Sequence, residues 1–136
     1  MADSFRIAVS SDFIKPDGSP AFPMFDMSPL DDMANVEWQY LAERDGPVSA
    51  AELAGYDALI LLGQRFDRTS VPADGQLAHV ARFGVGYDTV DVAVCSDNGI
   101  ALTITPDGVR RPVAVSIIAL MLACTGKLLI KDKMTR

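Results

Sequence analysis

The distribution of hydrophobic and polar residues along the chain predicts a small set of short strands. Short, mainly apolar runs alternate with turn-forming residues, as buried strands of a parallel sheet do. These predicted strands cover residues 5–10, 36–41, 57–62, 76–83 and 100–105. The second run alternates and carries Trp38 and Tyr40, residue types that favour strands.

Capping residues predict short helices between these strands. Ser49 with Glu52 three residues later forms a capping box, and Asp88 stands at the N-cap of a helix that Gly99 would end. Ser28, followed by proline, is a further helix start. Strands that alternate with helices predict an α/β fold, with a mostly parallel sheet and helices on both faces.

The segment from residue 12 to residue 29 does not fit this alternation. It holds prolines at positions 16, 20, 23 and 29 together with several Phe and Met residues. Prolines at this density forbid a regular helix, and the apolar content is too high for a flexible linker. We expect a packed, irregular segment. A second proline-containing stretch, residues 106–108, predicts a turn out of the last strand.

The last helix is predicted from Val113 to Ile130, followed by a polar tail at 131–136. Its apolar residues occupy every side of the helix, which indicates burial on all sides. Either the helix packs on another domain or subunit, or it is a central core helix; the small size of the chain favours the first. The apolar run at 112–126, about 15 residues, is short for a membrane span of ~20 residues, so no membrane segment is expected.

Composition narrows the classes of function. Hydrophobic residues make up 49% of the 136 residues, and the mean hydropathy is +0.20. Both values are slightly high for a free-standing domain, which indicates that part of its surface is covered. A net charge of −6 without a basic cluster argues against nucleic-acid binding. Cys95 and Cys124 fit no metal or redox spacing, so we expect reduced, buried thiols in a cytoplasmic protein. His79 is the only histidine, which favours a structural role and excludes a zinc site built from several histidines.

The candidate chemistry lies at the end of the fourth predicted strand. Gly84 and Gly86 flank Val85, and Tyr87 follows. Two glycines at this spacing let the backbone turn sharply, and successive N–H groups can then form a concave anion-binding site. We interpret the stretch as a binding site for something small and negative, either a substrate carboxylate or a cofactor phosphate.

The phosphate alternative is the weaker one on the residues alone. The predicted strand, the Gly-x-Gly and the predicted helix nearly match the pattern of dinucleotide-binding proteins. Asp107, about twenty residues later, stands near the place of the acidic residue in that pattern. Thr89, however, replaces the third glycine, and Asp107 falls beyond the end of the following strand. A phospho-accepting receiver domain is excluded by Gly63 and Gln64, which stand where its carboxylate is needed.

The stretch RFGVGYDTVDV (82–92), followed by NGIALTITPDGVRRPVAVSIIALMLA (98–123), resembles the N-terminal part of the D-isomer-specific 2-hydroxyacid dehydrogenases. This family includes phosphoglycerate, formate and glycerate dehydrogenases. The resemblance is strong from about residue 77 to residue 127, and before that only the order of strands fits.

The resemblance implies a flavodoxin-like substrate domain over residues 1–108 and a crossover or interface helix with a tail over residues 109–136. Backbone N–H groups of Val85 and Gly86 would bind the carboxylate of a 2-hydroxy or 2-keto acid, and Gly84 and Tyr87 would shape the loop. Gln64, at a neighbouring strand end, is a further candidate to face the substrate. The helix would cross to a Rossmann domain that binds NAD or NADP, and would contribute to a homodimer.

In the family, the cofactor fingerprint and the catalytic arginine, glutamate and histidine lie downstream of this helix. His79 and Arg82 do not match the catalytic residues, nor do Arg110 and Arg111. We therefore expect no catalytic residue, no NAD site and no dehydrogenase activity in this chain alone. Val115 and Ile117 also stand where family members often carry Glu and Thr. The alternative is a non-enzymatic flavodoxin-like module that binds a small acid or a protein partner.

Overall fold

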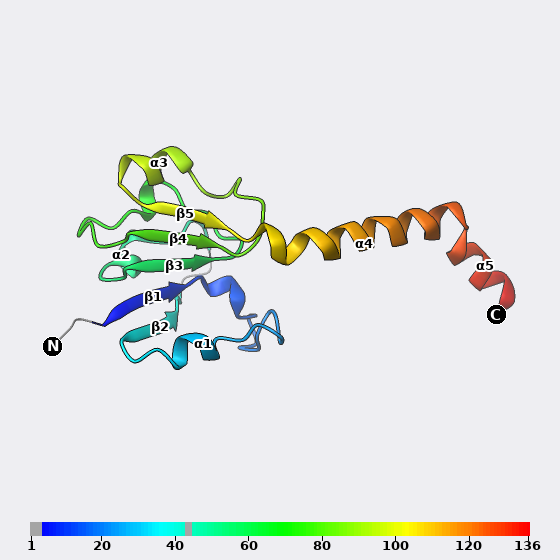
Figure 1. Cartoon of the computed structure of the whole chain (residues 1–136), viewed down its shortest axis with the longest axis horizontal. Coiled ribbons are helices and arrows are strands. Elements are labelled where there is room, and N and C mark those ends of the chain that lie inside the picture. The colour runs from blue at the N-terminus through cyan, green and yellow to red at the C-terminus, as the bar shows by residue number, and fades with distance from the viewer. Residues whose placement is uncertain (1–3, 43–44) are drawn as a thin grey trace. The chain divides into compact units, whose positions relative to one another are not determined.

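The computed structural model describes residues 4–42 and 45–136, and the chain divides into two compact units. Unit 1 comprises Met1–Ile104 and unit 2 comprises Thr105–Arg136. Figure 1 shows a sheet with short helices in unit 1, and two helices in unit 2. Each unit is described separately below.

Unit 1 is built on a five-stranded sheet with the order β2-β1-β3-β4-β5, in which every neighbouring pair is parallel. Its strands are β1 (Phe5–Val9), β2 (Val36–Tyr40), β3 (Ala58–Leu61), β4 (His79–Arg82) and β5 (Ala101–Ile104). The predicted α/β fold is confirmed, and this strand order is the flavodoxin-like one. The carboxyl ends of the strands therefore meet at one edge of the sheet (Figure 1).

The main core lies on one face of this sheet. Ala8, Leu59 and Val80 are paired across β1, β3 and β4, so their side chains share that face, and all three are fully buried. Helices α2 (Ala50–Leu53) and α3 (Val92–Asp97) contribute buried side chains to the same cluster. The continuous apolar runs in the sequence correspond to these strands, buried between layers.

A third helix, α1 (Ser28–Asp31), lies against the edge strand β2. Trp38 is paired with Ile7, one position away from the pair that contains Ala8, so its side chain points to the opposite face. Its indole Nε1 donates a hydrogen bond to Asp31 Oδ1 at 2.7 Å. The two faces of the sheet are thus contacted by different helices, as predicted.

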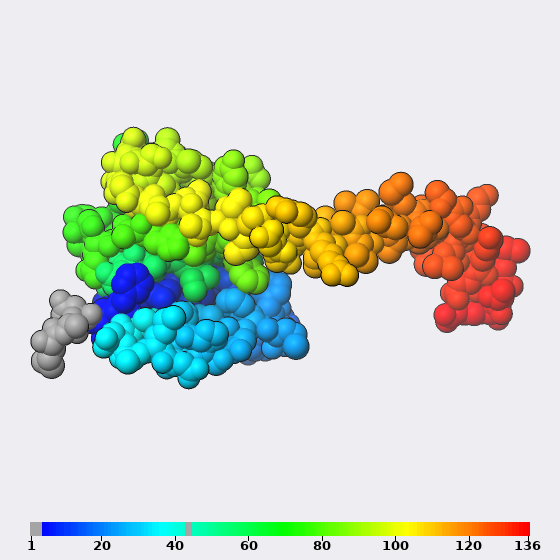
Figure 2. Space-filling view, viewed as in Figure 1, coloured from blue at the N-terminus to red at the C-terminus, as the bar shows by residue number. Residues whose placement is uncertain are grey.

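The segment after β1 is irregular, as its prolines predict, but the expectation that it is packed is wrong: within residues 12–29 only Phe13 is buried, and Met24 is 93% exposed. It begins with a 3-10 helix, η1 (Ser11–Phe13), and an isolated bridge joins Ile14 to Pro20. The space-filling view shows the residues that follow, in light blue, at the surface of unit 1 (Figure 2). The Phe13 side chain is buried beneath them.

Of the three predicted helix starts, the one at Ser49 is confirmed, and those at Asp88 and Ser28 need correction. Helix α3 takes Asp91 as its N-cap, whose carboxylate accepts a hydrogen bond from the Val94 amide at 3.1 Å, so the predicted cap at Asp88 is wrong. The reason is a turn closed by the bond from Val90 N to Tyr87 O, 2.9 Å, which delays the helix. Ser49 does cap α2, through a bond from the Ala51 amide, but the structure records no capping box there, and Glu52 Oε1 accepts from the Ala42 amide at 2.9 Å.

Smaller features complete unit 1. Ser28 is the first residue of α1 rather than its cap, because its own amide is bound to Asp26 Oδ1 at 3.0 Å. A second 3-10 helix, η2 (Arg68–Ser70), is capped by Asp67. Gly99 follows α3 with a φ of 69°, the left-handed conformation that lets a glycine end a helix.

Unit 2 consists of α4 (Pro106–Thr125) and α5 (Leu128–Thr135). Both the predicted turn at 106–108 and the single helix over 113–130 are wrong. Proline in the first helical turn lacks only an N–H that has no helical partner there, so Pro106 starts the helix instead of preventing it. Lys127, with a φ of 52°, is left-handed and separates the two helices.

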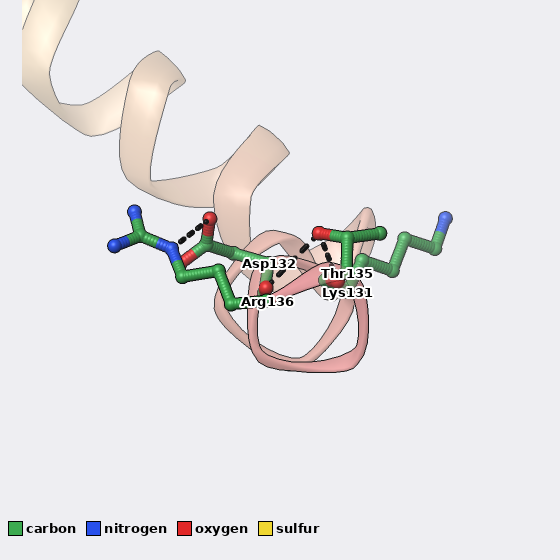
Figure 3. A network of polar contacts seen from close by, with 4 residues as sticks. All are labelled: Lys131, Asp132, Thr135 and Arg136. Atoms are coloured by element: carbon green, nitrogen blue, oxygen red, sulfur yellow. Dashed lines mark hydrogen bonds and ion pairs between the residues drawn. The ribbon is translucent and has the colours of Figure 1, made fainter.

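Residues 131–136, predicted to be a polar tail, are helical up to Thr135. Thr135 Oγ1 donates to the carbonyl oxygens of Lys131 at 3.2 Å and of Asp132 at 3.0 Å (Figure 3). Arg136 Nε donates to Asp132 Oδ1 at 3.1 Å, an ion pair across one helical turn. These side-chain contacts close the last turn of α5.

No residue of α4 or α5 is buried in the structure. The apolar side chains that the sequence places on all sides are exposed, and so is Cys124, which corrects the expectation that both thiols are buried. Helix α4 has 20 residues, and by length and composition alone it could cross a membrane. This helix is longer than the apolar run of about 15 residues on which the expectation of no membrane segment rests, and core helices of soluble proteins pass the same test.

Candidate functional site

The glycine loop, residues 84–87, follows β4 at the carboxyl edge of the sheet. Gly84 is buried and has a φ of 138°, a conformation that side-chain-bearing residues rarely adopt, so the chain can turn here only at a glycine. Val85, Gly86 and Tyr87 then project into solvent. The turn therefore presents three consecutive residues at an edge where α/β sheets bind ligands.

The end of β3 and the segment after it hold the two flanks of this loop. Before the loop, the Phe83 amide donates to Leu61 O at 2.8 Å. After it, Phe66 N donates to Thr89 O and Asp91 N donates to Phe66 O, each at 2.9 Å. Hydrogen bonds to the end of β3 and to the segment after it therefore fix both flanks of the loop.

The amides of the loop are the main chemical feature of the site. Within residues 4–42 and 45–136, no protein group accepts a hydrogen bond from the N–H of Val85, Gly86 or Tyr87. Consecutive free N–H groups on a fixed turn are a favourable arrangement for binding an anion. The chemistry of the site is therefore that of backbone donors, which can bind a carboxylate without any charged side chain.

Gln64 lies at the neighbouring strand end and is 8% exposed. Its Oε1 accepts hydrogen bonds from both the amide and the Oγ of Ser11, each at 3.1 Å. The side chain thus links the end of β3 to the end of β1. Direct contact between Gln64 and a substrate stays a prediction, and the observed geometry gives it a positioning role.

Asp12 is an anchor whose role sequence reasoning missed. Its Oδ2 accepts from the amides of Gly63 at 2.7 Å and Gln64 at 2.9 Å, and its Oδ1 accepts from Ser10 Oγ at 2.6 Å. One carboxylate therefore fixes the loop after β3, which in turn holds the glycine loop. The available signal was an acidic residue directly after two serines at a strand end.

Arg82, the last residue of β4, was also missed as a neighbour of the loop. Its guanidinium occupies the space that a Cβ at Gly84 would need, and its Nη1 donates to Phe83 O. The Nε atom is buried and has no partner among the described residues. This places a positive charge beside the loop, whereas the Asp88 carboxylate, which lies near Gly86, is exposed to water.

The remaining nucleophilic and titratable candidates lie apart from this loop. His79 Nε2 is 2.8 Å from Thr103 Oγ1, a cross-strand contact between β4 and β5. Burial raises the pKa of the Cys95 thiol, and the nearby Asp91 charge adds to that effect, so the thiol is unreactive. Across the described ranges, no group of three or more His, Cys, Asp or Glu residues is placed to hold a metal ion.

The glycine loop does not fit a dinucleotide. A pyrophosphate site needs the loop to open directly into a helix, whose N-terminus then faces the phosphates. Here α3 starts only at Val92, has six residues, and follows a turn that carries Asp88 and Asp91. The glycine loop therefore lacks the helix N-terminus that a pyrophosphate site uses.

Three cavities lie elsewhere on unit 1. The largest of them, about 420 Å³, is lined by Arg6, Trp38 and Tyr56 among others, beside the edge strand β2. Others of about 280 Å³ and 360 Å³ adjoin Leu77 and Leu41. None of these three includes a residue of the glycine loop. The free donors of the loop select an anion, whereas the size of a cavity selects no particular chemistry.

Taken together, the parallel sheet and the loop at its carboxyl edge define a flavodoxin-like α/β domain with free backbone donors beyond the fourth strand. The model of the D-isomer-specific 2-hydroxyacid dehydrogenase catalytic domain matches residues 21–115, well over half of the chain. The chain therefore belongs to this family, and the resemblance seen in the sequence is confirmed.

Characterised relatives agree with this assignment. The chain is 31% identical over 100 residues to the glyoxylate reductase of Thermococcus onnurineus. The matched region covers 73% of this chain and 30% of that protein. The chain is 30% identical over 118 residues to the glyoxylate reductase of Pyrococcus furiosus, with 85% and 35% covered. The chain thus spans about a third of the length of the curated relatives it matches.

Solved structures give the same result. A 2-hydroxyacid dehydrogenase from Ketogulonicigenium vulgare Y25 has a TM-score of 0.72 at 30% identity, over 98% of this chain and 40% of that one. The NAD+-bound 3-phosphoglycerate dehydrogenase of Entamoeba histolytica has a TM-score of 0.67 at 21% identity, over 88% and 39%. The second likeness, at its lower identity, shows the fold alone.

Proposed function

We propose that this chain is the substrate-binding portion of an NAD(P)-dependent D-2-hydroxyacid dehydrogenase. In this role, the amides of Val85 and Gly86 bind the carboxylate of a 2-hydroxy or 2-keto acid. Gly84 makes the turn, Tyr87 completes the loop, and Gln64 holds the neighbouring strand end. The observation that carries the proposal is the row of free amides on a turn fixed at both ends.

The physical chemistry of the loop supports this assignment. Backbone N–H groups that bind a carboxylate form charge-assisted hydrogen bonds, which are roughly twice as strong as neutral ones. The loop is fixed before the ligand arrives, so little conformational entropy is lost on binding. Arg82 adds a positive charge beside the loop, and the opposing Asp88 is weakened by its exposure to water.

Hydride transfer needs more than this site. It needs a nicotinamide cofactor held against the substrate and an acid–base group within hydrogen-bond reach. The only histidine of the sequence, His79, is engaged with Thr103 within the sheet. We therefore expect residues 1–108 to act as the substrate domain of an enzyme whose cofactor is bound by a further Rossmann domain. The 136-residue chain, assayed by itself with NADH and a 2-keto acid, should be inactive; measurable turnover would contradict this.

The proposal assigns residues 109–136 to an interface with the cofactor domain or a second subunit, in a cytoplasmic enzyme. Its support is the exposure of the apolar side chains of α4. The isolated chain should then self-associate through the segment from Val113 to Ile130, since large exposed apolar patches seek a partner. Sedimentation that shows a clean monomer at high concentration would contradict this part of the proposal.

A second candidate, a non-enzymatic module that binds its partner through α4, rests on the same exposure. The natural reading frame separates the two candidates. A Gly-x-Gly-x-x-Gly segment soon after position 136 supports the enzyme, whereas a stop codon there supports the module.

The loop can be tested by removing one donor. Val85→Pro deletes the N–H of residue 85, and the matched control Val85→Ala keeps that N–H while it also loses the valine side chain. By calorimetry, we expect pyruvate to bind the wild-type chain and Val85→Ala alike. The Val85→Pro variant should bind about 10-fold to 100-fold more weakly, the range that one hydrogen bond to a charged group corresponds to.

Circular dichroism checks that the proline variant is folded. Equal pyruvate affinity of a folded Val85→Pro chain and the wild type would show that the Val85 amide does not bind the carboxylate. No pyruvate binding to any of the three chains would reject the proposed site altogether.

A further inference from the structure

A group of four phenylalanine side chains lies beside the glycine loop. This phenylalanine cluster consists of Phe13 from η1, Phe22 and Phe25 from the irregular segment, and Phe83, the residue directly before Gly84. The Phe83 ring is 5.4 Å from that of Phe13, 5.8 Å from that of Phe22 and 5.0 Å from that of Phe25, measured between ring centroids. Phe13 and Phe25 stack at 4.8 Å. The rings therefore form one continuous apolar surface.

The backbone fixes this cluster in place. Ala21 N donates to Phe13 O at 2.8 Å, and Phe25 N donates to Phe22 O at 2.9 Å. Phe83 is fixed independently by its bond to Leu61 O, which also positions the glycine loop. The prolines of the irregular segment restrict its backbone further. The cluster and the loop are thus parts of the same rigid arrangement at the carboxyl edge of the sheet.

The cluster is only partly buried. Phe13 is covered, whereas Phe22 is 42% exposed and Phe25 and Phe83 keep part of their surface in solvent. These rings leave apolar surface in water beside the loop, and an apolar group of a ligand bound at the loop would be stabilised by covering it. Two residues of chain span at most about 7 Å, so the Phe83 backbone lies within that distance of Val85.

We propose that the phenylalanine cluster binds the apolar side chain of the acid whose carboxylate the glycine loop binds. This inference rests on the proposed function and narrows its substrate class. The substrate is a 2-hydroxy or 2-keto acid with a bulky apolar or aromatic substituent. An acid without such a substituent, such as glyoxylate or pyruvate, uses the loop but leaves the cluster exposed to water.

Calorimetric titration of the full 136-residue chain tests the inference with two probes, pyruvate and phenylpyruvate. They share the carboxylate and the keto group and differ by one phenyl ring. Edge-to-face and stacked ring contacts add a factor of about 2 to 12 to binding, beyond the effect of buried area. We expect phenylpyruvate to bind at least about tenfold more tightly than pyruvate.

Phe22→Ala supplies the variant, because this ring is exposed and its loss leaves the buried core intact. Met24→Ala is the matched control, an apolar truncation two residues away at a side chain that is 93% exposed. Phe22→Ala should weaken phenylpyruvate binding about fivefold or more and leave pyruvate binding unchanged. Met24→Ala should change neither affinity.

The outcomes separate the two proposals. If pyruvate binds and phenylpyruvate binds no more tightly, the apolar site is rejected while the carboxylate site stands. If Phe22→Ala weakens both acids equally, or Met24→Ala lowers the phenylpyruvate affinity as much as Phe22→Ala does, the cluster is not the ring-binding surface. If neither acid binds the wild-type chain, the carboxylate site itself is rejected and the inference fails with it.

Discussion

Leu59 in unit 1 and Leu120 in unit 2 are the same residue in opposite surroundings. Leu59 lies between the sheet and its helices with 0% of its surface exposed, whereas Leu120 on α4 is 65% exposed. The same contrast holds for the two units as wholes. Unit 1 has a core cluster to which strands and helices contribute, and unit 2 has no buried residue.

The two units differ in the source of their stability. The sheet of unit 1 buries its continuous apolar runs within the unit, so the carboxyl-edge loops rest on a packed support. Unit 2 has helical backbone bonds but no apolar contact layer, and isolated helices of this kind are marginal in water. The proposed site therefore lies in unit 1, and the apolar side chains of unit 2 are exposed.

The largest expected effect is on the stability of the two units. Leu59→Ala should lower the free energy of unfolding by about 2 to 5 kcal/mol, because it leaves a cavity in the core. At protein concentrations low enough to keep the chain monomeric, Leu120→Ala should change it by less than about 0.5 kcal/mol, because that side chain has no buried contacts within the chain. Urea denaturation of the two variants measures both values. A large loss for Leu120→Ala would show that α4 is packed in solution.

Two glycines give effects of opposite sign. Gly84→Ala should cost about 1 to 3 kcal/mol, because a φ of 138° is strained for alanine. Gly108→Ala, in α4 with open space around the added Cβ, should stabilise its helix by about 0.5 to 1 kcal/mol. Thermal unfolding followed by circular dichroism reports both changes. Equal behaviour of the two variants would contradict the conformation assigned to the glycine loop.

The two thiols should differ in reactivity. Cys95 is buried, and burial raises the pKa of its thiol, so little thiolate forms near pH 8. Cys124 is exposed on α4 and should react with a disulfide reagent at least about tenfold faster. Slow reaction at Cys124 in a folded chain would show that its helix is covered, and comparison at low and high protein concentration would show whether a second copy covers it.

The smallest expected effect concerns acid. A side-chain hydrogen bond from Thr69 lowers the pKa of Asp67, and backbone hydrogen bonds from Gln76 and Gly55 lower the pKa of Asp74. Each group stabilises unit 1 above its unfolded pKa of about 3.9, and that contribution is lost as pH falls through the lower folded pKa. Stability measured between pH 5 and 2, compared with an Asp74→Asn variant, should show a slightly shallower acid loss in the variant. An identical pH profile would argue against these contacts.

Much of the fold could be predicted from the sequence, since apolar runs and turn residues act locally. The strands lie where the runs predict them, and Ser49 and Gly99 act at the helix ends as expected. The start of α3 could not be predicted, because a turn closed by Val90 and Tyr87 takes up the residues after Asp88. Pro106 also admits two interpretations, since proline suits both a turn and the first turn of a helix.

The candidate site likewise contains residues that could be predicted from the sequence and residues that could not. The glycines of the loop were found because their spacing has a local meaning. Asp12 and Arg82 were not assigned to the site, since their roles depend on contacts with Gly63, Gln64 and Gly84, which only the packing of strands brings near. Sequence spacing does not encode such contacts.

The central claim is that the free amides of the glycine loop bind a carboxylate. It is tested most directly by titrating the ¹⁵N-labelled chain with glycolate and following every amide by NMR. The account predicts saturable shifts centred on Val85, Gly86 and Tyr87, with the amides of α4 and α5 unmoved. Saturable shifts located elsewhere, or none at the loop at saturating acid, would contradict it.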